Sequence, residues 1–153
     1  MMQEPRIFSI YTDGACSTNG TWDGGAGVFI HMDEVGNPEP NDRMFYMAQK
    51  ETTNNVMELK GFLFALEYAG KNIDAYDIIK IHSDSAYVLN CLKNGWYRKW
   101  ESNGWLTAKR DPVANKEIWI EVLEAWRKLT FHNLEIIKVK SDVSPNQKFE
   151  CCN

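Results

Sequence analysis

The sequence IFSIYTDGACSTN, residues 7 to 19, joins an apolar run to a charged end. The run from Ile7 to Tyr11 is typical of a buried strand, and it ends at Asp13, which Gly14 follows. A carboxylate at the end of a rigid strand can be held in place while it reaches an ion, as a metal or catalytic site requires. Asp-Gly is also a common turn. The dipeptide alone leaves both interpretations open.

The composition is that of one globular domain. A chain of 153 residues with 44% hydrophobic content and six tryptophans can bury a full core, so we expect a single domain over 1–153. Its 17 basic and 21 acidic residues give a net charge of −4, which argues against binding of nucleic acid by overall charge. A polyanionic partner must therefore meet a local basic patch or bound cations.

The cysteines and the amino terminus favour a cytoplasmic protein. The four cysteines show no CxxC motif and no secretory framework, which predicts reduced thiols. The first residues, MMQEPRIF, lack the apolar core of a signal peptide, and no apolar run approaches transmembrane length. We expect no membrane partner, and a monomer by default.

Hydrophobic periodicity predicts three meandering strands followed by alternating helices and strands. After the strand that begins at Ile7, strands are expected at Gly24–Met32, Met44–Ala48, Ile78–His82 and Leu134–Val139, and helices at Thr52–Gly70, Ala86–Leu92 and Asn115–Leu129. The first two strands would form an antiparallel hairpin. This order predicts a mixed sheet covered by helices.

The segment Gly95 to Arg110, GWYRKWESNGWLTAKR, is a dense basic and aromatic patch in an acidic protein. We expect most of its indole area to pack onto the body of the domain while its basic side chains face phosphates. The indoles are those of Trp96, Trp100 and Trp105, and the basic residues are Arg98, Lys99, Lys109 and Arg110.

Three acids stand out: Asp13 and Asp84 each follow a predicted strand, and Glu58 lies on the predicted helix Thr52–Gly70. If the strands that precede the two aspartates are parallel neighbours, both carboxylates lie at one sheet edge, and the helix between them can direct Glu58 into the gap. Such like charges raise one another's pKa unless a cation compensates, and oxygen-only ligands favour Mg²⁺ or Mn²⁺ over Zn²⁺. Two ions about 4 Å apart can activate water at a phosphodiester. Asp84 could instead cap the following helix, and Glu58 could be a solvated charge.

Four ordered motifs give the chain a resemblance to type 1 ribonuclease H from about Ile7 to Lys140. They are YTDGAC from Tyr11, TTNNVMEL from Thr52, SDSAYV from Ser83, and GWYRKWESNGW from Gly95 continuing to KRDPVANKEIW. The resemblance implies a ribonuclease H-like fold, with a five-stranded mixed sheet of three antiparallel and then parallel strands flanked by helices. It also implies a magnesium-dependent endoribonuclease that hydrolyses the RNA strand of RNA/DNA hybrids. Asp13, Glu58 and Asp84 would be the catalytic acids and the ligands of two Mg²⁺ ions, with Mn²⁺ as a substitute.

The same resemblance implies a set of substrate-binding residues. Gly14, Ala15, Cys16 and Asn19 match positions that line the RNA strand, whereas Asn54 and Asn55 match positions that reach both strands in the minor groove. Amide side chains can donate to and accept from 2′-hydroxyl groups. Thr53 would hold a DNA phosphate, and Asn115 and Trp96 are further contacts. Ala86 departs from the family, whose members often carry a polar, RNA-contacting residue there.

The final residues, VKSDVSPNQKFECCN, depart further from the family pattern. Asp142 stands where the family has a histidine, and is either a catalytic residue or an ordinary acid in a turn before proline. The family's fourth aspartate aligns with Glu150 or with Cys152, depending on the gap, or has no counterpart. We also expect the family's last helix to be absent.

Two competing functions follow from the resemblance and its gaps. The missing histidine and fourth aspartate would suit a catalytically silent module that binds RNA/DNA hybrids. Another nuclease or a strand-transfer enzyme on the same fold is a third hypothesis, against which Asn54, Asn55 and the basic segment speak.

Overall fold

The computed structural model describes residues 6–16, 24–33, 43–49, 53–72, 77–130 and 133–139. The mixed α/β architecture predicted from the sequence is confirmed within these ranges. The elements in chain order are β1 (Ile7–Cys16), β2 (Gly24–Asp33), β3 (Arg43–Gln49), α1 (Asn54–Asn72), β4 (Ile78–Ser83), α2 (Ala86–Asn94), α3 (Trp96–Asn103), α4 (Lys116–Leu129) and β5 (Leu134–Lys138).

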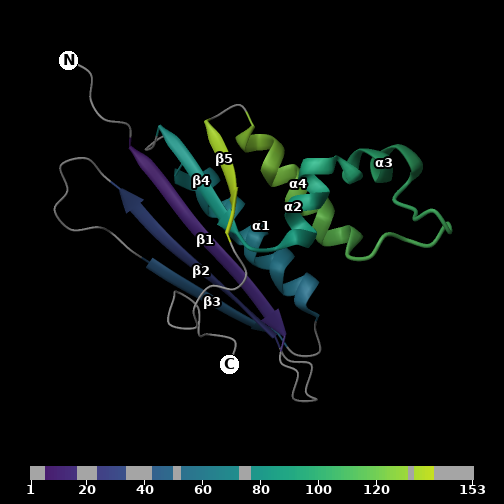
Figure 1. Cartoon of the computed structure of the whole chain (residues 1–153), viewed down its shortest axis with the longest axis horizontal. Coiled ribbons are helices and arrows are strands. Elements are labelled where there is room, and N and C mark those ends of the chain that lie inside the picture. The colour runs from purple at the N-terminus through teal and green to yellow at the C-terminus, as the bar shows by residue number, and fades with distance from the viewer. Residues whose placement is uncertain are drawn as a thin grey trace.

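The described strands form one sheet in the order β3-β2-β1-β4-β5 (Figure 1). The pairs β1–β2 and β2–β3 are antiparallel, and the pairs β1–β4 and β4–β5 are parallel. The predicted hairpin of the first two strands is therefore confirmed. The central strand β1 has neighbours of both kinds, so its carboxyl end meets the carboxyl end of β4.

One face of the sheet carries the hydrophobic core. Phe8 and Ile10 of β1 and Ile79 and Ile81 of β4 alternate with less buried neighbours, as expected for strands with one covered face. They pack with buried residues of α1, α2 and α4, including Trp119, which is fully buried. Figure 1 shows these helices to one side of the strands. The core thereby fixes α1 against the central strand.

Helix α1 begins within the predicted range and ends later than expected. The Oγ1 of Thr53 accepts a hydrogen bond from the Val56 N–H at 3.2 Å, which caps the first turn. Gly70 does not end the helix, which continues to Asn72. The Asn72 side-chain amide donates to the Tyr68 carbonyl at 2.9 Å, which adds a side-chain hydrogen bond to the last turn.

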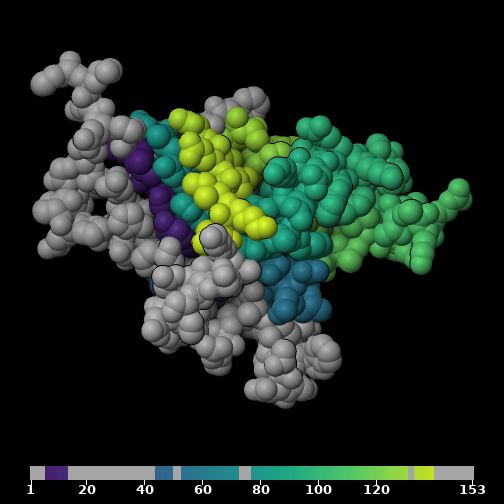
Figure 2. Space-filling view, viewed as in Figure 1, coloured from purple at the N-terminus to yellow at the C-terminus, as the bar shows by residue number. Residues whose placement is uncertain are grey.

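The basic and aromatic segment folds as α3 and a loop that protrude from the body (Figure 2). Gly95 ends α2 with φ 72°, and its N–H donates to the Cys91 carbonyl, while Gly104 ends α3 with φ 81°. These left-handed conformations favour glycine, so two glycines define the limits of α3.

The pair Asp13–Gly14 is part of β1 and does not form a turn. Strand β1 continues to Cys16, which pairs with Gly24 of β2. On its other side, however, the pairing with β4 stops at Thr12 and Ser83. The prediction of a strand end at Asp13 is therefore correct only for the parallel half of the sheet.

Candidate active site

The parallel register of β1 and β4 places Asp13 and Asp84 side by side. Thr12 pairs with Ser83, and each aspartate is the next residue of its chain. Adjacent strands lie about 4.8 Å apart, so side chains at equivalent positions can touch. The nearness of Asp13 also contributes to the pKa of Asp84, which it lowers.

Glu58 reaches this edge from the second turn of α1. Its side chain is partly buried, and its Oε2 accepts a hydrogen bond of 2.7 Å from the Ser85 hydroxyl. Burial raises the pKa of Glu58, and repulsion from Asp84 acts in the same direction, whereas the hydrogen bond from Ser85 lowers it. Asp13, Glu58 and Asp84 are hereafter called the acid cluster.

The electrostatics of the acid cluster oppose full ionisation. Burial raises the pKa of Asp84, and hydrogen bonds from its own backbone N–H and with Asp13 offset only part of this shift. Within the described ranges, no group of three His, Cys, Asp or Glu side chains has a geometry that could hold a metal ion. The acids are instead neighbours in pairs, Asp13 with Asp84 and Asp84 with Glu58. A divalent cation would relieve the repulsion between these carboxylates.

The predicted hybrid-binding residues of α1 lie at its exposed start. Thr53, Asn54 and Asn55 are all exposed. Asn54 precedes Glu58 by four residues, so both side chains lie on the same helix face, one turn apart. The Thr53 hydroxyl already caps the helix, which is compatible with an additional contact on its exposed side.

Asn115 is held by Tyr87, a residue that the sequence did not single out. Asn115 precedes α4 in a left-handed conformation, φ 62°, and its Nδ2 donates to the Tyr87 Oη at 3.4 Å. The buried Trp119 donates its Nε1–H to the same oxygen at 2.8 Å. Because Tyr87 belongs to the first turn of α2, these bonds bring Asn115 next to the helix that follows Asp84.

The three tryptophans of the protruding segment differ in their environments. Trp100 lies 5.8 Å from Trp105 and 5.8 Å from Trp119 between ring centroids, and both Trp100 and Trp105 pack against the core. For these two the predicted packing is confirmed. Trp96 differs, because it is 44% exposed at the start of α3 and is not among the residues that pack against the core. The predicted phosphate-facing side chains are exposed, namely Arg98, Lys99, Lys109 and Arg110.

The remaining predicted residues fall in two groups. Gly14, Ala15 and Cys16, which the resemblance assigns to the RNA strand, belong to the end of β1. Asn19, Asp142 and the two candidates for a fourth acid position, Glu150 and Cys152, lie outside the described residues.

Ser85 belongs to the motif SDSAYV, but the sequence did not identify it as a partner of Glu58. Its contact with Glu58 spans 27 residues, so no local sequence pattern could reveal it.

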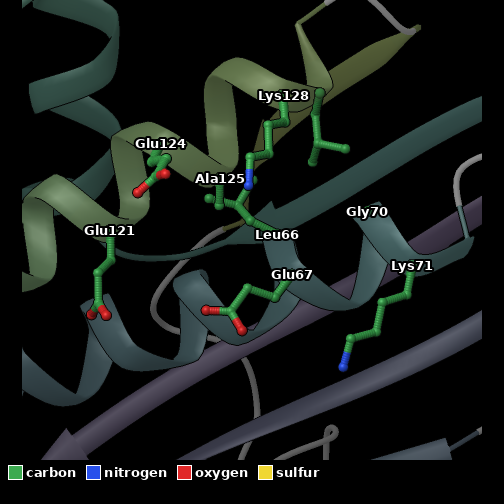
Figure 3. A pocket seen from close by; sticks show the side chains of 9 residues that line it. Leu66, Glu67, Gly70, Lys71, Glu121, Glu124, Ala125 and Lys128 are labelled. Atoms are coloured by element: carbon green, nitrogen blue, oxygen red, sulfur yellow. The ribbon is translucent and has the colours of Figure 1, made fainter.

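A separate groove of about 510 Å³ lies between α1 and α4 (Figure 3). Its charged lining residues are Glu67, Lys71, Glu121, Glu124 and Lys128. None of the predicted site residues belongs to it. Three glutamates against two lysines do not favour a polyanion, so we place the candidate active site at the acid cluster.

Comparisons with known proteins identify the family of the chain. The family model described as RNase H matches residues 5–148. A ribonuclease H of Prosthecochloris aestuarii is 39% identical over 131 residues, which cover 86% of this chain and 80% of that protein. A ribonuclease H of Symbiobacterium thermophilum is 37% identical over 147 residues, which cover 91% of this chain and 86% of that protein.

A solved structure shows the same fold. It is the crystal structure of a type 1 RNase H with the type 2 active-site motif, with a TM-score of 0.71 and 23% sequence identity. The match covers 94% of this chain and 67% of that chain. The fold is therefore ribonuclease H-like, and the chain belongs to the ribonuclease H family.

Proposed function

We propose that the acid cluster is the site with which this ribonuclease H hydrolyses the RNA strand of RNA/DNA hybrids. The observation that carries the proposal is the adjacency of the three acids. Asp13 and Asp84 directly follow the paired residues Thr12 and Ser83, and Glu58 accepts a hydrogen bond from Ser85, the residue after Asp84. Partly buried carboxyl groups that repel one another, on rigid elements, are typical of a site that binds cations.

The donor set fits Mg²⁺, and also Mn²⁺, because all three side chains offer oxygen ligands. When bound, two such ions would supply positive charge that activates water and stabilises the leaving oxygen of a phosphodiester. Asp13 would hold both ions, while Glu58 and Asp84 would each hold one. The reaction adds water across the P–O3′ bond: the hydroxide remains on phosphorus as a 5′-phosphate, and the proton passes to the leaving 3′-oxygen.

Recognition of the hybrid would begin at the start of α1. Asn54 and Asn55 are exposed beside Glu58, and their amide groups suit the 2′-hydroxyl groups and base edges of the shallow minor groove. Gly14, Ala15 and Cys16 follow Asp13 directly and would line the RNA strand, as would Asn19. Contacts to ribose near the acid cluster would direct cleavage to the RNA strand.

The DNA strand would be held by a second set of residues. Thr53 would bind a DNA phosphate, and Asn115 would bind DNA while Tyr87 orients its amide. The exposed indole of Trp96 offers a flat surface to a sugar, and exposed basic residues of α3 and its loop would neutralise phosphates. A local basic surface of this kind can serve a protein whose net charge is −4.

The wider setting of this activity is also part of the proposal. No helix in the described ranges is long and apolar enough to cross a bilayer. We propose that the chain acts in the cytoplasm as a monomer, that residues 1–153 form one domain with an insertion at about 95–112, and that Asp142 is a further catalytic candidate.

The decisive test is cleavage of a labelled RNA/DNA hybrid in Mg²⁺ by the wild-type protein and by Asp13→Asn. Glu135→Gln is a matched control, because it also removes one carboxylate but from an exposed site on β5. We expect the wild type and the control to cleave, and Asp13→Asn to be inactive. Hybrid binding without cleavage by the wild type, in Mg²⁺ or Mn²⁺, would instead establish a silent binding module.

A further inference from the structure

We infer that Ser85 is a positioning residue that holds the Glu58 carboxylate toward Asp84 and thereby sets the affinity of the acid cluster for a divalent cation. The inference rests on the proposed function, because it takes Glu58 and Asp84 as the cation's ligands. It adds a residue outside the acids themselves.

The Ser85 hydroxyl group accepts one hydrogen bond and donates another. Ser85 is 3% exposed and is the N-cap of α2, where its Oγ accepts a hydrogen bond of 3.1 Å from the Val88 N–H. The same Oγ donates to Glu58 Oε2 at 2.7 Å. A hydroxyl group has a single proton to donate. Because Oγ accepts the Val88 N–H with a lone pair, its proton is available to donate to Glu58.

The backbone around Ser85 keeps this hydroxyl in place. The Ser85 N–H donates to the Ser83 Oγ at 3.1 Å, and the Ser83 carbonyl accepts from the Val139 N–H at 2.9 Å. Ser83 is itself 3% exposed, so water does not compete for these groups. These bonds keep the Ser85 Oγ at a position from which its proton reaches Glu58.

Glu58 needs such a constraint because its other neighbour repels it. Asp84 lies close enough to oppose a negative charge on Glu58, and a glutamate side chain without a fixed donor would turn toward water. The Ser85 hydroxyl is a donor whose oxygen is held in place by the cap. Outer partners of this kind orient metal-binding carboxylates, and their removal costs about 10 to 100-fold in metal affinity or activity.

The test separates this role from helix capping with three variants. Ser85→Gly keeps most of the capping function but removes the donor, Ser85→Ala removes both, and Ser85→Thr keeps both. Ile79→Val is a control for stability loss, because it removes a buried methylene from the start of β4, away from the acid cluster. Mn²⁺ affinity is measured without hybrid from the electron paramagnetic resonance signal of free Mn²⁺, and kcat and KM are measured at limiting and saturating Mg²⁺.

We expect Ser85→Gly and Ser85→Ala to weaken Mn²⁺ binding about 10-fold and to lower kcat at limiting Mg²⁺, with KM for the hybrid unchanged. Ser85→Thr should restore Mn²⁺ affinity, and Ile79→Val should retain it. Wild-type Mn²⁺ affinity in Ser85→Gly, or an equal loss in Ile79→Val, would overturn the inference. An inactive wild type whose Mn²⁺ affinity still falls in Ser85→Gly would support the inference and overturn the proposed function, so the two fail separately.

Discussion

The acid cluster and the insertion around α3 have opposite effects on the stability of the fold. In the acid cluster, burial raises the pKa of Glu58 and of Asp84, so ionisation there opposes folding. In the insertion, aromatic packing stabilises the structure, and Arg127 of α4 donates two hydrogen bonds, of 2.8 and 2.6 Å, to the Glu101 carboxylate. The acid cluster thus lowers stability, although it lies on a rigid sheet edge. The candidate nucleic-acid surface lies on α3, which its packing and its hydrogen bonds to α4 stabilise.

The largest effect on activity is expected from the acid cluster. Asp84→Asn keeps the size of the side chain but removes a charged ligand, so we expect cleavage of the hybrid to fall about 100 to 1,000-fold. Hybrid affinity in Ca²⁺ should change far less, because the exposed residues of α1 and α3 remain. Rates of cleavage and binding isotherms check both. A variant that loses affinity as severely as rate would show that Asp84 is mainly a binding residue.

The largest effect on stability is expected from the insertion. Trp100 packs on Trp105 and Trp119, so Trp100→Ala should lower the free energy of unfolding by about 3 kcal/mol. The exposed Trp96 is the matched control: Trp96→Ala should cost less than about 0.5 kcal/mol while weakening hybrid binding. Urea unfolding measures both. Equal losses of stability would remove the distinction between the packed and the exposed indole.

The sequence predicted those features that depend on local patterns of residues. Alternation and helical spacing gave the strands and helices, and the position of Asp84 after an apolar run placed it at a sheet edge. The motif at residues 7 to 19 did not show that β1 continues to Cys16. The antiparallel pairing of β1 with β2 extends to Cys16, whereas its parallel pairing with β4 ends at Thr12, and a local pattern does not distinguish the two. Partners distant in sequence, such as Ser85 for Glu58 and Tyr87 for Asn115, depend on tertiary structure and were not predicted.

A smaller effect concerns pH in the metal-free protein. Because the pKa of Asp84 is raised by folding, its contribution to stability is present below the unfolded pKa of about 3.9 and is lost as pH rises through the folded value. Asp84→Asn should therefore stabilise the protein by up to about 1 kcal/mol at neutral pH, after allowance for solvent screening, and not at about pH 3. Urea unfolding in EDTA at both pH values tests this. A stability difference that does not change with pH would contradict it.

The smallest effect is expected from the ion pair that joins α3 to α4. The hydrogen bonds from Arg127 lower the pKa of Glu101, so their contribution is present above the unfolded pKa of about 4.3 and is lost as pH falls through the lowered value. Both partners are substantially exposed, and Glu101→Gln should cost only about 0.5 kcal/mol at neutral pH. Thermal unfolding in low and high salt measures it. A cost that salt does not reduce would contradict an electrostatic origin.

The most direct test of the acid cluster as a cation site is the stabilisation that Mg²⁺ gives the wild type and Asp84→Asn. A ligand that binds only the folded protein raises its stability in proportion to the logarithm of one plus the ratio of ligand concentration to Kd. In EDTA at neutral pH the variant should melt at a higher temperature than the wild type. With increasing Mg²⁺ the Tm of the wild type should rise and that of the variant should stay nearly constant. Equal rises in both proteins, or a variant that melts below the wild type in EDTA, would contradict the assignment.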